Sequence, residues 1–431
     1  MTTRLRIIVT GLIAQHPGLG GVAWDYVQYP VGLSRLGHDV FYFEDSGQWP
    51  YRQDGGASGD DWVAPDCKAN VEYLNETLEK FGLADKWAYR FATSGEWYGL
   101  SDQLRREVID SADLIIDVSG TLEWPENYDR AGRLVYIDSD PVFTQLRVVA
   151  DPAQLGLSAH DEEEERKFQR RVAAHDVHFT FGEAMSDEVP STPYEWQPTR
   201  QPILLAEWHP DRGDNGLFTT VMSWTSYKPF NVQGRTYGQK DVEFRKFLGL
   251  PESISSEFAI AMNSTVHANW ETLTPEDSAP VKDSSHVTTP AEILKQAGWQ
   301  VVDARTACDG LDNYRSFIEG SRGEWSVAKH GYVVGRSGWF SCRSACYLAA
   351  GKPVVVEDTG FAKILPVGEG VLTFTNLDEA VSAINEVEGN YRRHAKAARA
   401  LAEEFFDSRK VLTDLIERAG SEPRVSSPKS E

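Results

Sequence analysis

Cysteine and positive charge are both scarce in this sequence. Only four cysteines occur in 431 residues, a usage that suits a reducing compartment, so we expect a cytoplasmic protein. Cys342 and Cys346 lie close together, but no second pair and no histidine follows at ligand spacing, and no zinc site is expected. Long apolar runs are also lacking, and none approaches the ~20 residues that a membrane-spanning helix needs.

The shortage of positive charge limits the partners. Lys and Arg number 43 against 65 Asp and Glu, which gives a formal net charge of −22. So acidic a surface repels phosphate backbones and anionic lipid headgroups, and neither nucleic acid nor a membrane is expected as a main partner. A local basic pocket for a small anion is compatible with this charge.

Short β-branched runs alternate with helix-length amphipathic stretches along most of the chain. The first run could belong to a signal peptide, but no small-residue cleavage site follows it, and it predicts a buried first strand. Strands separated by helices predict an α/β fold of parallel βαβ units, whose ligands bind at the carboxyl ends of the strands. The predicted strands are 5–13, 39–45, 112–120, 133–140, 176–183, 218–224, 257–263, 299–304, 331–335 and 352–360.

Composition divides this pattern into two halves. A segment rich in Pro and turn residues, 190–215, is typical of an interdomain linker, and the alternation restarts after it. We expect one lobe at 1–205, a second at 206–400, a helix at 401–420 and a disordered tail at 421–431. The polar stretch 264–290 predicts a loop, and the acidic run 161–166 a solvated helix face.

Two segments carry a resemblance to a known family. Residues 337–361 (SGWFSCRSACYLAAGKPVVVEDTGF) contain a helix pattern that ends in Ala-x-Gly-x-Pro-Val before a strand, and residues 33–44 (LSRLGHDVFYFE) contain Leu-x-x-x-Gly-His-x-Val. These are similar to the donor and acceptor lobes of the two-lobed (GT-B) glycosyltransferases. The spacing of Ser341, Arg343 and Gly351 resembles the spore-maturation-protein-B-like, family-1-type members.

The resemblance implies two Rossmann-like lobes facing a central cleft, with the acceptor on the first lobe and a nucleoside diphosphate sugar on the second. The implied reaction moves a hexosyl group from this co-substrate to an acceptor hydroxyl, without a further cofactor. One departure stands out. Many retaining members carry two glutamates on the donor-site helix, and this sequence has Gly338 and Cys346 at those positions.

The expected donor site needs cations for the diphosphate and polar groups for the sugar. Lys240 stands where a loop enters a helix, and Arg343 follows Ser341 at the start of another, although each could be a plain surface cation. A strongly apolar strand then ends in polar and small residues that could meet sugar hydroxyls, or could simply form a turn. These residues are Glu357, Asp358, Thr359 and Gly360.

The expected acceptor site centres on His16, in the loop after the first strand. An imidazole suits a general base, and the resemblance implies an aspartate from a later strand end as its orienter. Asp117 is the predicted orienter and Asp138 a substitute base, while Gly18, Gly20 and Gly21 form an acceptor loop that permits close approach. Asp138-Ser-Asp140 has the letters of a metal motif but lies in the wrong lobe, and we expect metal independence.

Three other functions compete with sugar transfer. Gly18, Gly20 and Ala23 fit the dinucleotide fingerprint, with Glu44 about 20 residues on, which would indicate an NAD-dependent oxidoreductase. Against it, the glycines fall well past the strand end. A nucleotide-sugar epimerase and a non-catalytic sugar- or nucleotide-binding protein share the scaffold, and the loss of glutamate at Cys346 favours the latter.

Overall fold

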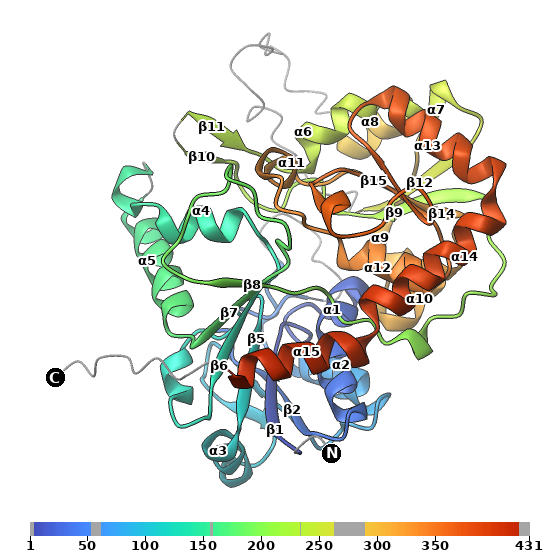
Figure 1. Ribbon diagram of the computed structural model, residues 1–431. Helices are drawn as coiled ribbons and strands as arrows, with labels where there is room; N and C mark the ends of the chain where they lie inside the picture. The colour runs from blue at the N-terminus through green and yellow to red at the C-terminus, as the bar shows by residue number, and fades with distance from the viewer. Residues whose placement is uncertain (1–3, 53–61, 156–157, 233, 263–288, 422–431) are drawn as a thin grey trace. The chain divides into compact units, whose positions relative to one another are not determined.

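The computed structural model describes residues 4–52, 62–155, 158–232, 234–262 and 289–421 (Figure 1). The predicted loop at 264–290 therefore lies outside the described residues except for its end, and so does all but the first residue of the predicted tail. The chain divides into two compact units. Unit 1 comprises Met1–Glu183, Val189–Leu205 and Phe405–Glu431, and unit 2 comprises Ala184–Glu188 and Ala206–Glu404.

Unit 1 is built on an eight-stranded sheet with the order β4-β3-β2-β1-β5-β6-β7-β8. β4 runs antiparallel to β3, and the other neighbouring strands are parallel. The strand order reverses between β1 and β5, so a ligand crevice is expected at their carboxyl ends. The strands are β1 (Arg6–Thr10), β2 (Asp39–Glu44), β3 (Trp87–Arg90), β4 (Trp97–Gly99), β5 (Leu114–Val118), β6 (Leu134–Asp138), β7 (Val177–Thr180) and β8 (Trp196–Pro198).

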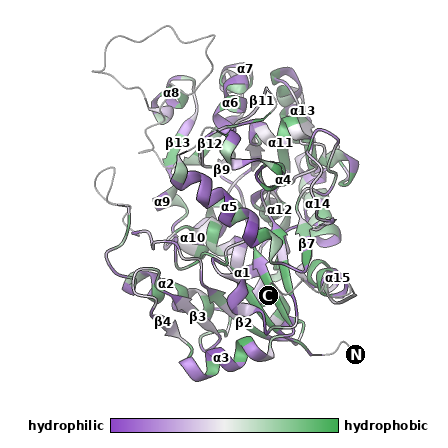
Figure 2. Cartoon of the chain, turned by 90° about the vertical axis from the view of Figure 1, so that its left-hand side faces the viewer, coloured by the Kyte–Doolittle hydropathy of each residue, from purple (hydrophilic) through white to green (hydrophobic). Residues whose placement is uncertain are grey.

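The helices of unit 1 include the last helix of the chain. They are α1 (Gly20–Arg35), α2 (Lys68–Glu79), α3 (Asp102–Ser111), α4 (Phe143–Val149), α5 (Ala159–Ala173) and α15 (Ser408–Ser421). α15 packs on α1 so closely that a Cβ built on Gly32 would lie 2.4 Å from Leu412. α5 contains the acidic run, and Figure 2 shows it as hydrophilic along most of its length; among its residues only Phe168 and Val172 are buried, so the predicted solvated face is confirmed.

Unit 2 contains a six-stranded parallel sheet with the order β13-β12-β9-β14-β15-β16. Its order reverses between β9 and β14, which sets a second expected crevice at those carboxyl ends. The strands are β9 (Leu217–Val221), β12 (Glu257–Met262), β13 (Gln300–Asp303), β14 (Gly323–Ser326), β15 (Val354–Glu357) and β16 (Val371–Phe374), beside a hairpin of β10 (Phe230–Val232) and β11 (Arg235–Tyr237).

The helices of unit 2 follow its strands in the order that βαβ units require. They are α6 (Lys240–Phe244), α7 (Leu250–Ser253), α8 (Pro290–Gln296), α9 (Ala304–Ala307), α10 (Gly310–Glu319), α11 (His330–Gly335), α12 (Cys342–Ala349), α13 (Leu377–Gly389) and α14 (Tyr391–Leu401). None of the described helices in either unit is both long and apolar enough to cross a membrane.

Most predicted strands are present, and one predicted strand is wrong. Residues 331–335 form part of helix α11, although their two valines suggested a strand. The predicted linker 190–215 contains the passage from unit 1 to unit 2 after Leu205, and its first part also includes β8, which pairs with β7 and extends the first sheet. β14 was missed because its sequence, Gly-Glu-Trp-Ser, lacks β-branched residues.

Candidate functional site

The loop between β1 and α1 is held by a buried carboxylate. Glu44, at the end of β2, accepts hydrogen bonds from the backbone N–H groups of Ala14 (2.8 Å) and Gln15 (2.6 Å). Burial raises the pKa of Glu44 to about 8, although these hydrogen bonds oppose the shift. The amide of Asn70 donates to the carbonyl oxygens of Ala14 and Tyr51. The loop is therefore fixed on several sides.

His16 lies in this fixed loop with its ring stacked on Tyr51, at 4.9 Å between centroids and 24° between planes. Burial lowers the pKa of His16 to about 4. The imidazole is therefore neutral at pH 7 and keeps a lone pair that can accept a proton. A general base needs this neutral form, but a pKa of about 4 also makes the imidazole a weaker proton acceptor than the ordinary histidine on which the prediction was based.

Asp117 does not pair with His16, and the predicted dyad needs correction. One carboxylate oxygen accepts from the hydroxyl of Thr10 (2.7 Å) and the backbone N–H of Thr121 (2.7 Å). The other lies 3.1 Å from Nε2 of His175, whose ring is fully buried. No hydrogen bond or ion pair joins His16 to Asp117 in the described residues. Asp117 is thus a buried residue near the carboxyl end of β5, bonded to its neighbours in unit 1.

Asp138 is also internal to unit 1. Its carboxylate accepts from the Thr144 hydroxyl (2.7 Å), the Gln145 amide (2.9 Å) and the Thr180 hydroxyl (2.7 Å). Burial raises the pKa of Asp138 to about 6 against these hydrogen bonds. A side chain 1% exposed with three side-chain donors has no free oxygen for an acceptor, so its predicted role as a substitute base loses its geometric basis.

The glycines after β1 form a turn into α1. Gly18 has φ +80°, a backbone conformation that L side chains rarely adopt, while Gly20 and Gly21 are the first residues of the helix. In a dinucleotide site the acidic residue at the end of β2 would face the ribose. Here Glu44 is fully buried and bound to the loop, which opposes the NAD-dependent alternative.

Unit 2 has a pocket at the carboxyl ends of β14 and β15, and β14 is also one of the two strands between which the sheet order reverses. The start of α12 forms one wall, and the segment after β15 forms another. Four predicted donor residues meet in this pocket. Its lining residues are Ser326, Val327, Ala328, Trp339, Phe340, Ser341, Arg343, Ser344, Val356, Glu357, Thr359 and Phe361.

Arg343 lines the pocket, but its guanidinium is engaged by the protein. Nε donates to Glu324 (2.6 Å), and the two terminal nitrogens donate to the Val221 carbonyl (2.7 Å) and the Ser326 hydroxyl (2.6 Å). Arg343 thereby joins the carboxyl ends of β9 and β14. The predicted role as a direct diphosphate ligand is corrected to that of a residue that holds the two strand ends.

Lys240, the first residue of α6, is the second of the two cations predicted to bind the diphosphate. Among the described residues it has no hydrogen bond or ion pair. Burial, together with the charges of Arg343 and Lys329, lowers the pKa of Lys240 well below its usual range, and Glu324 opposes this. An anion placed beside this ammonium would relieve the unfavourable charge, which is what a diphosphate site needs.

Glu357 ends β15 beside the pocket and is almost wholly buried. Its Oε2 accepts from the backbone N–H of Ala328 (3.0 Å), and Glu243 of α6 lies close enough to affect its pKa. Burial, and then the interaction with Glu243, raise the pKa of Glu357 to about 10. Burial and the neighbouring Glu243 thus both favour the neutral form of this carboxyl group.

The residues after Glu357 form a tight turn. Asp358 accepts from the N–H of Gly360 (2.8 Å) and pairs with Arg336 (3.2 Å). Gly360 has φ +97°, and a Cβ there would lie 3.1 Å from the Arg336 carbonyl oxygen. The hydroxyl of Thr359 donates to the Trp339 carbonyl. Glycine is thus required by the turn itself.

The positions of the two missing glutamates differ in character. Gly338 has φ +79°, and a Cβ would lie 2.6 Å from the backbone nitrogen of Ala184, so no larger residue fits there without a shift of the main chain. Cys346 is buried within α12. The backbone conformation at Gly338 therefore excludes a glutamate at this position.

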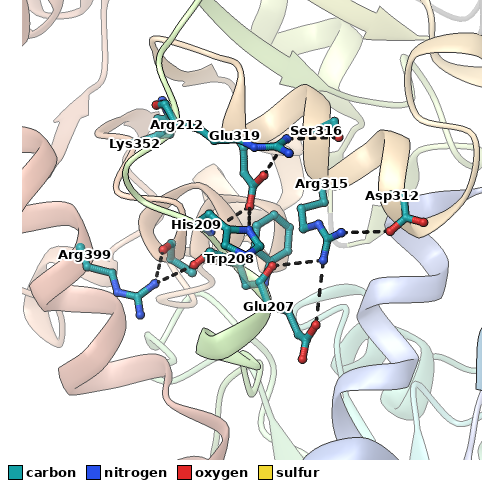
Figure 3. Close-up of polar contacts among 11 residues, drawn as sticks. Glu207, Trp208, His209, Arg212, Asp312, Arg315, Ser316, Glu319, Lys352 and Arg399 are labelled. Atoms are coloured by element: carbon teal, nitrogen blue, oxygen red, sulfur yellow. Dashed lines mark hydrogen bonds and ion pairs between the residues drawn. The ribbon is translucent and has the colours of Figure 1, made fainter. Parts of the chain in front are cut away.

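A second polar cluster in unit 2 fixes the segment that leads into β9 (Figure 3). Glu319, fully buried at the end of α10, accepts from the backbone N–H of His209 (2.8 Å), contacts its ring (2.9 Å) and pairs with Arg212 (3.1 Å). Arg399 of α14 donates to the carbonyls of Trp208 (3.2 Å) and Ala349. The cluster is thus an anchor for residues 207–212.

Sequence reasoning missed the partners of the site residues. Glu243, Glu324 and His175 are each fixed against a residue that was singled out. None of these three residues follows an apolar strand pattern, which is the sequence signal that indicated Asp117, Asp138 and Glu357. A buried charge inside a short strand, as in Glu324 of β14, is the one signal that could have indicated an ion pair.

No family model and no curated protein matches the sequence, but solved structures are similar to it. An α-glucosyltransferase in complex with UDP-glucose and DNA is 13% identical with a TM-score of 0.53, and the match covers 97% of this chain and 100% of that one. A sucrose-phosphate synthase from Thermosynechococcus elongatus is 12% identical (TM-score 0.50; 96% and 98% covered). A glycosyltransferase from Rickettsia africae ESF-5 is 11% identical (TM-score 0.50; 97% and 98%).

These matches cover nearly the whole of each chain, so they include the residues of both units. At 11% to 13% identity they show the fold alone. The chain has the two-lobed GT-B fold of these glycosyltransferases, with two Rossmann-like lobes. The predicted fold class is confirmed.

Proposed function

We propose that the protein is a glycosyltransferase that moves a sugar from a nucleoside diphosphate sugar to an acceptor hydroxyl. Unit 2 would bind the donor and unit 1 the acceptor. The observation that carries the proposal is Lys240, a partly buried lysine without a described partner, whose charge interacts with that of Arg343 in the lining of the unit 2 pocket. That arrangement is unfavourable without a bound anion and favourable with a diphosphate.

The rest of the pocket supports the same ligand. The N-terminus of α12 opens onto it, with Ser341 and Arg343 in the lining, and unpaired backbone N–H groups at a helix start bind phosphate oxygens. Glu357 and Thr359 offer polar atoms for sugar hydroxyls. The UDP-glucose named for the α-glucosyltransferase is a donor of the class that we propose here.

His16 would act as the general base. Its neutral imidazole accepts the proton of the acceptor hydroxyl while the hydroxyl oxygen bonds to the anomeric carbon. The bond from that carbon to the β-phosphate oxygen breaks, and the diphosphate leaves with its negative charge beside Lys240. Because a protein cation can supply this stabilisation, we propose that no metal ion is required.

The finer family assignment also stays a proposal. Ser341 and Arg343 keep the spacing of the spore-maturation-protein-B-like members, and both line the pocket. Arg343 contributes by joining β9 and β14 rather than through a free guanidinium. We therefore propose that the chain belongs with the spore-maturation-protein-B-like members of the GT-B fold.

The test is a calorimetric and thermal-shift panel of UDP, GDP, dTDP and their sugars. We expect micromolar binding of one nucleotide by the wild type and at least about tenfold weaker binding by Lys240→Met, because one charge-assisted contact is lost. Lys295→Met, an exposed lysine of α8, is the matched control and should bind as the wild type does.

Each alternative predicts its own result in this panel. Stabilisation by NAD with silence towards all nucleotides and sugars would overturn the proposal. Nucleotide-sugar binding without any slow hydrolysis of the donor would favour the non-catalytic binding protein. Release of sugar and nucleoside diphosphate in a product assay supports the transferase.

A further inference from the structure

Four large apolar side chains of unit 1 are exposed around the loop that contains His16. Their exposed fractions are 40% for Leu19, 54% for Trp49, 37% for Tyr51 and 39% for Val63. His16 itself is partly exposed. We call these five residues the apolar patch. Exposed apolar groups that gather in one place are typical of a binding surface, whereas single ones are ordinary.

Backbone contacts bring the segments of the apolar patch together. The N–H of Tyr51 donates to the carbonyl oxygen of Gln15 (2.9 Å), and Tyr51 forms an antiparallel bridge with Val63. Residues opposite each other in such a bridge place their side chains on the same face. The Tyr51 ring stacks on His16, whose carbonyl oxygen accepts from the N–H of Leu19 (3.2 Å). The apolar side chains therefore surround the candidate base.

Trp49 extends the patch along the chain. Residues 50–52 and 62–64 are joined by backbone hydrogen bonds on both sides of the bridge at Tyr51, so this segment has the pairing of a strand. Side chains two residues apart in extended backbone lie on the same face. We therefore expect the exposed ring of Trp49 to lie on the face that Tyr51 occupies.

The carboxylates near this loop are bound inside the protein. Asp45, which follows β2, accepts from the Tyr128 hydroxyl (3.0 Å) and pairs with Arg90 (3.4 Å). The other three have the internal partners described above. Saccharides are held by carboxylates and amides that bond their hydroxyls in fixed directions, and these oxygens are already engaged. The four carboxylates, none more than 3% exposed, are Glu44, Asp45, Asp117 and Asp138.

We propose that the acceptor is a flat aromatic alcohol, a phenol whose ring packs against Trp49 and Tyr51 with its hydroxyl at His16. The inference rests on the proposed function and names the acceptor class of the same reaction. An aromatic ring gains both from the removal of apolar surface from water and from ring–ring packing. Leu19 and Val63 add apolar contact at the border of the patch.

The acidity of a phenol also suits the base. Burial lowers the pKa of His16 to about 4, and so weak a base removes a proton best from an acidic hydroxyl. A phenol has a pKa of about 10, as the tyrosine side chain does, whereas water has a pKa of about 16 and aliphatic alcohols resemble it. The phenol proton moves to the imidazole, and the phenol oxygen bonds to the anomeric carbon. The bond from that carbon to the diphosphate breaks, and its electron pair leaves with the diphosphate.

Acceptor binding can be measured without a donor. In saturation-transfer NMR and calorimetry, we expect the wild type to bind 1-naphthol and not to bind maltose. Trp49→Ala should bind 1-naphthol at least about fivefold more weakly because a packed ring is lost, whereas Trp49→Phe should stay within about twofold of the wild type. Leu104→Ala removes an exposed apolar side chain from α3 of the same unit and should bind as the wild type does.

Transfer can be measured with UDP-glucose, or with whichever sugar nucleotide the binding panel identifies. Mass spectrometry should detect the naphthyl glycoside. 1-Naphthalenemethanol presents the same ring with an aliphatic hydroxyl, and it should react at least about tenfold more slowly because that hydroxyl is less acidic. Equal rates for the two alcohols would refute the choice of a phenol.

The two experiments separate the possible failures. Absence of 1-naphthol binding, or equal binding by the wild type and Trp49→Ala, overturns the inference and leaves the donor site untouched. Maltose binding that weakens in Trp49→Ala would make the acceptor a saccharide, also against the inference. Binding of 1-naphthol that depends on Trp49, beside silence towards every sugar nucleotide, would refute the proposed function and with it the acceptor role of the patch. Because Trp49 is exposed, both of its variants should keep the melting temperature of the wild type.

Discussion

Arg343 and Glu324 form a buried ion pair in unit 2, with 2.6 Å between Nε and Oε1 and with Glu324 wholly inaccessible. The pair crosses from the start of α12 to the middle of β14. A further donor of Arg343 reaches β9, so the guanidinium connects the two strands at which the sheet order reverses. The most basic group of the predicted donor motif is thus part of the framework of the pocket.

Removal of this arginine should destabilise the protein more than it affects ligand chemistry. Arg343→Ala leaves Glu324 buried without its partner, and we expect a loss of about 3–5 kcal/mol in the free energy of unfolding. Urea unfolding followed by circular dichroism measures it. The exposed pair of Arg393 and Glu369 is the control, since Arg393→Ala should leave the urea midpoint of unfolding almost unchanged. Equal costs for the two variants would refute this role.

Nucleotide binding should be coupled to proton uptake at Lys240. Burial and neighbouring cations lower the pKa of Lys240 in the free protein, and a bound diphosphate raises it again. The complex therefore binds more protons than the free protein does, and affinity falls as pH rises. Calorimetry in buffers of different ionisation enthalpy measures this uptake. It should vanish in Lys240→Met, and uptake that survives in this variant would place the proton elsewhere.

The proposed catalytic base, His16, should stay in its neutral, proton-accepting form well below pH 7. The pKa of His16 is lowered to about 4, so its imidazole stays neutral, and active, as pH falls from 7 to 5. We expect the acid limb of kcat/KM to begin near pH 4 rather than at the ordinary histidine value of about 6.5.

His16→Gln should lower kcat by roughly 10²–10⁴ with little change in donor affinity, because the base acts on the acceptor. His160→Gln, on the exposed face of α5, is the matched control and should retain full activity. A limb near pH 6.5, or an active His16→Gln protein, would assign the base to another group.

The packing of α15 on α1 should stabilise unit 1 strongly. Leu412 is fully buried against Gly32, and Leu412→Ala should cost about 2–5 kcal/mol. Glu417→Ala, on the exposed side of the same helix, should change stability by no more than about 0.5 kcal/mol. Hydrogen exchange should locate the weakened protection in the α1 peptide, and unchanged exchange there would contradict the packing argument.

The fold could be predicted largely because apolar β-branched runs dominate its central strands. β5, β6 and β15 are buried throughout, β1 is buried except at Arg6, and all four were recognised as strands. β14 carries Glu324 and Ser326 at the site itself, so the local signal was weakest where function matters most. The two valines of α11 predicted a strand, but this segment is a helix because tertiary packing overrides their strand propensity.

The candidate site could be predicted as a set of positions but not as a set of contacts. Ser341, Arg343, Glu357 and Thr359 do line one pocket. Which of them faces a ligand depends on partners distant in the chain, such as Glu243 for Glu357 and His175 for Asp117. Such pairings are set by the sheet order, and single-sequence patterns contain no information on them.

The return of α15 to unit 1 has a consequence for biosynthesis. The sheet of unit 1 is encoded before Leu205, yet the helix that covers Gly32 of α1 begins only at Ser408. A ribosome must therefore deliver all of unit 2 before the first unit can complete its packing. We expect nascent chains released before α15 to expose the apolar face of α1 and to depend on chaperones.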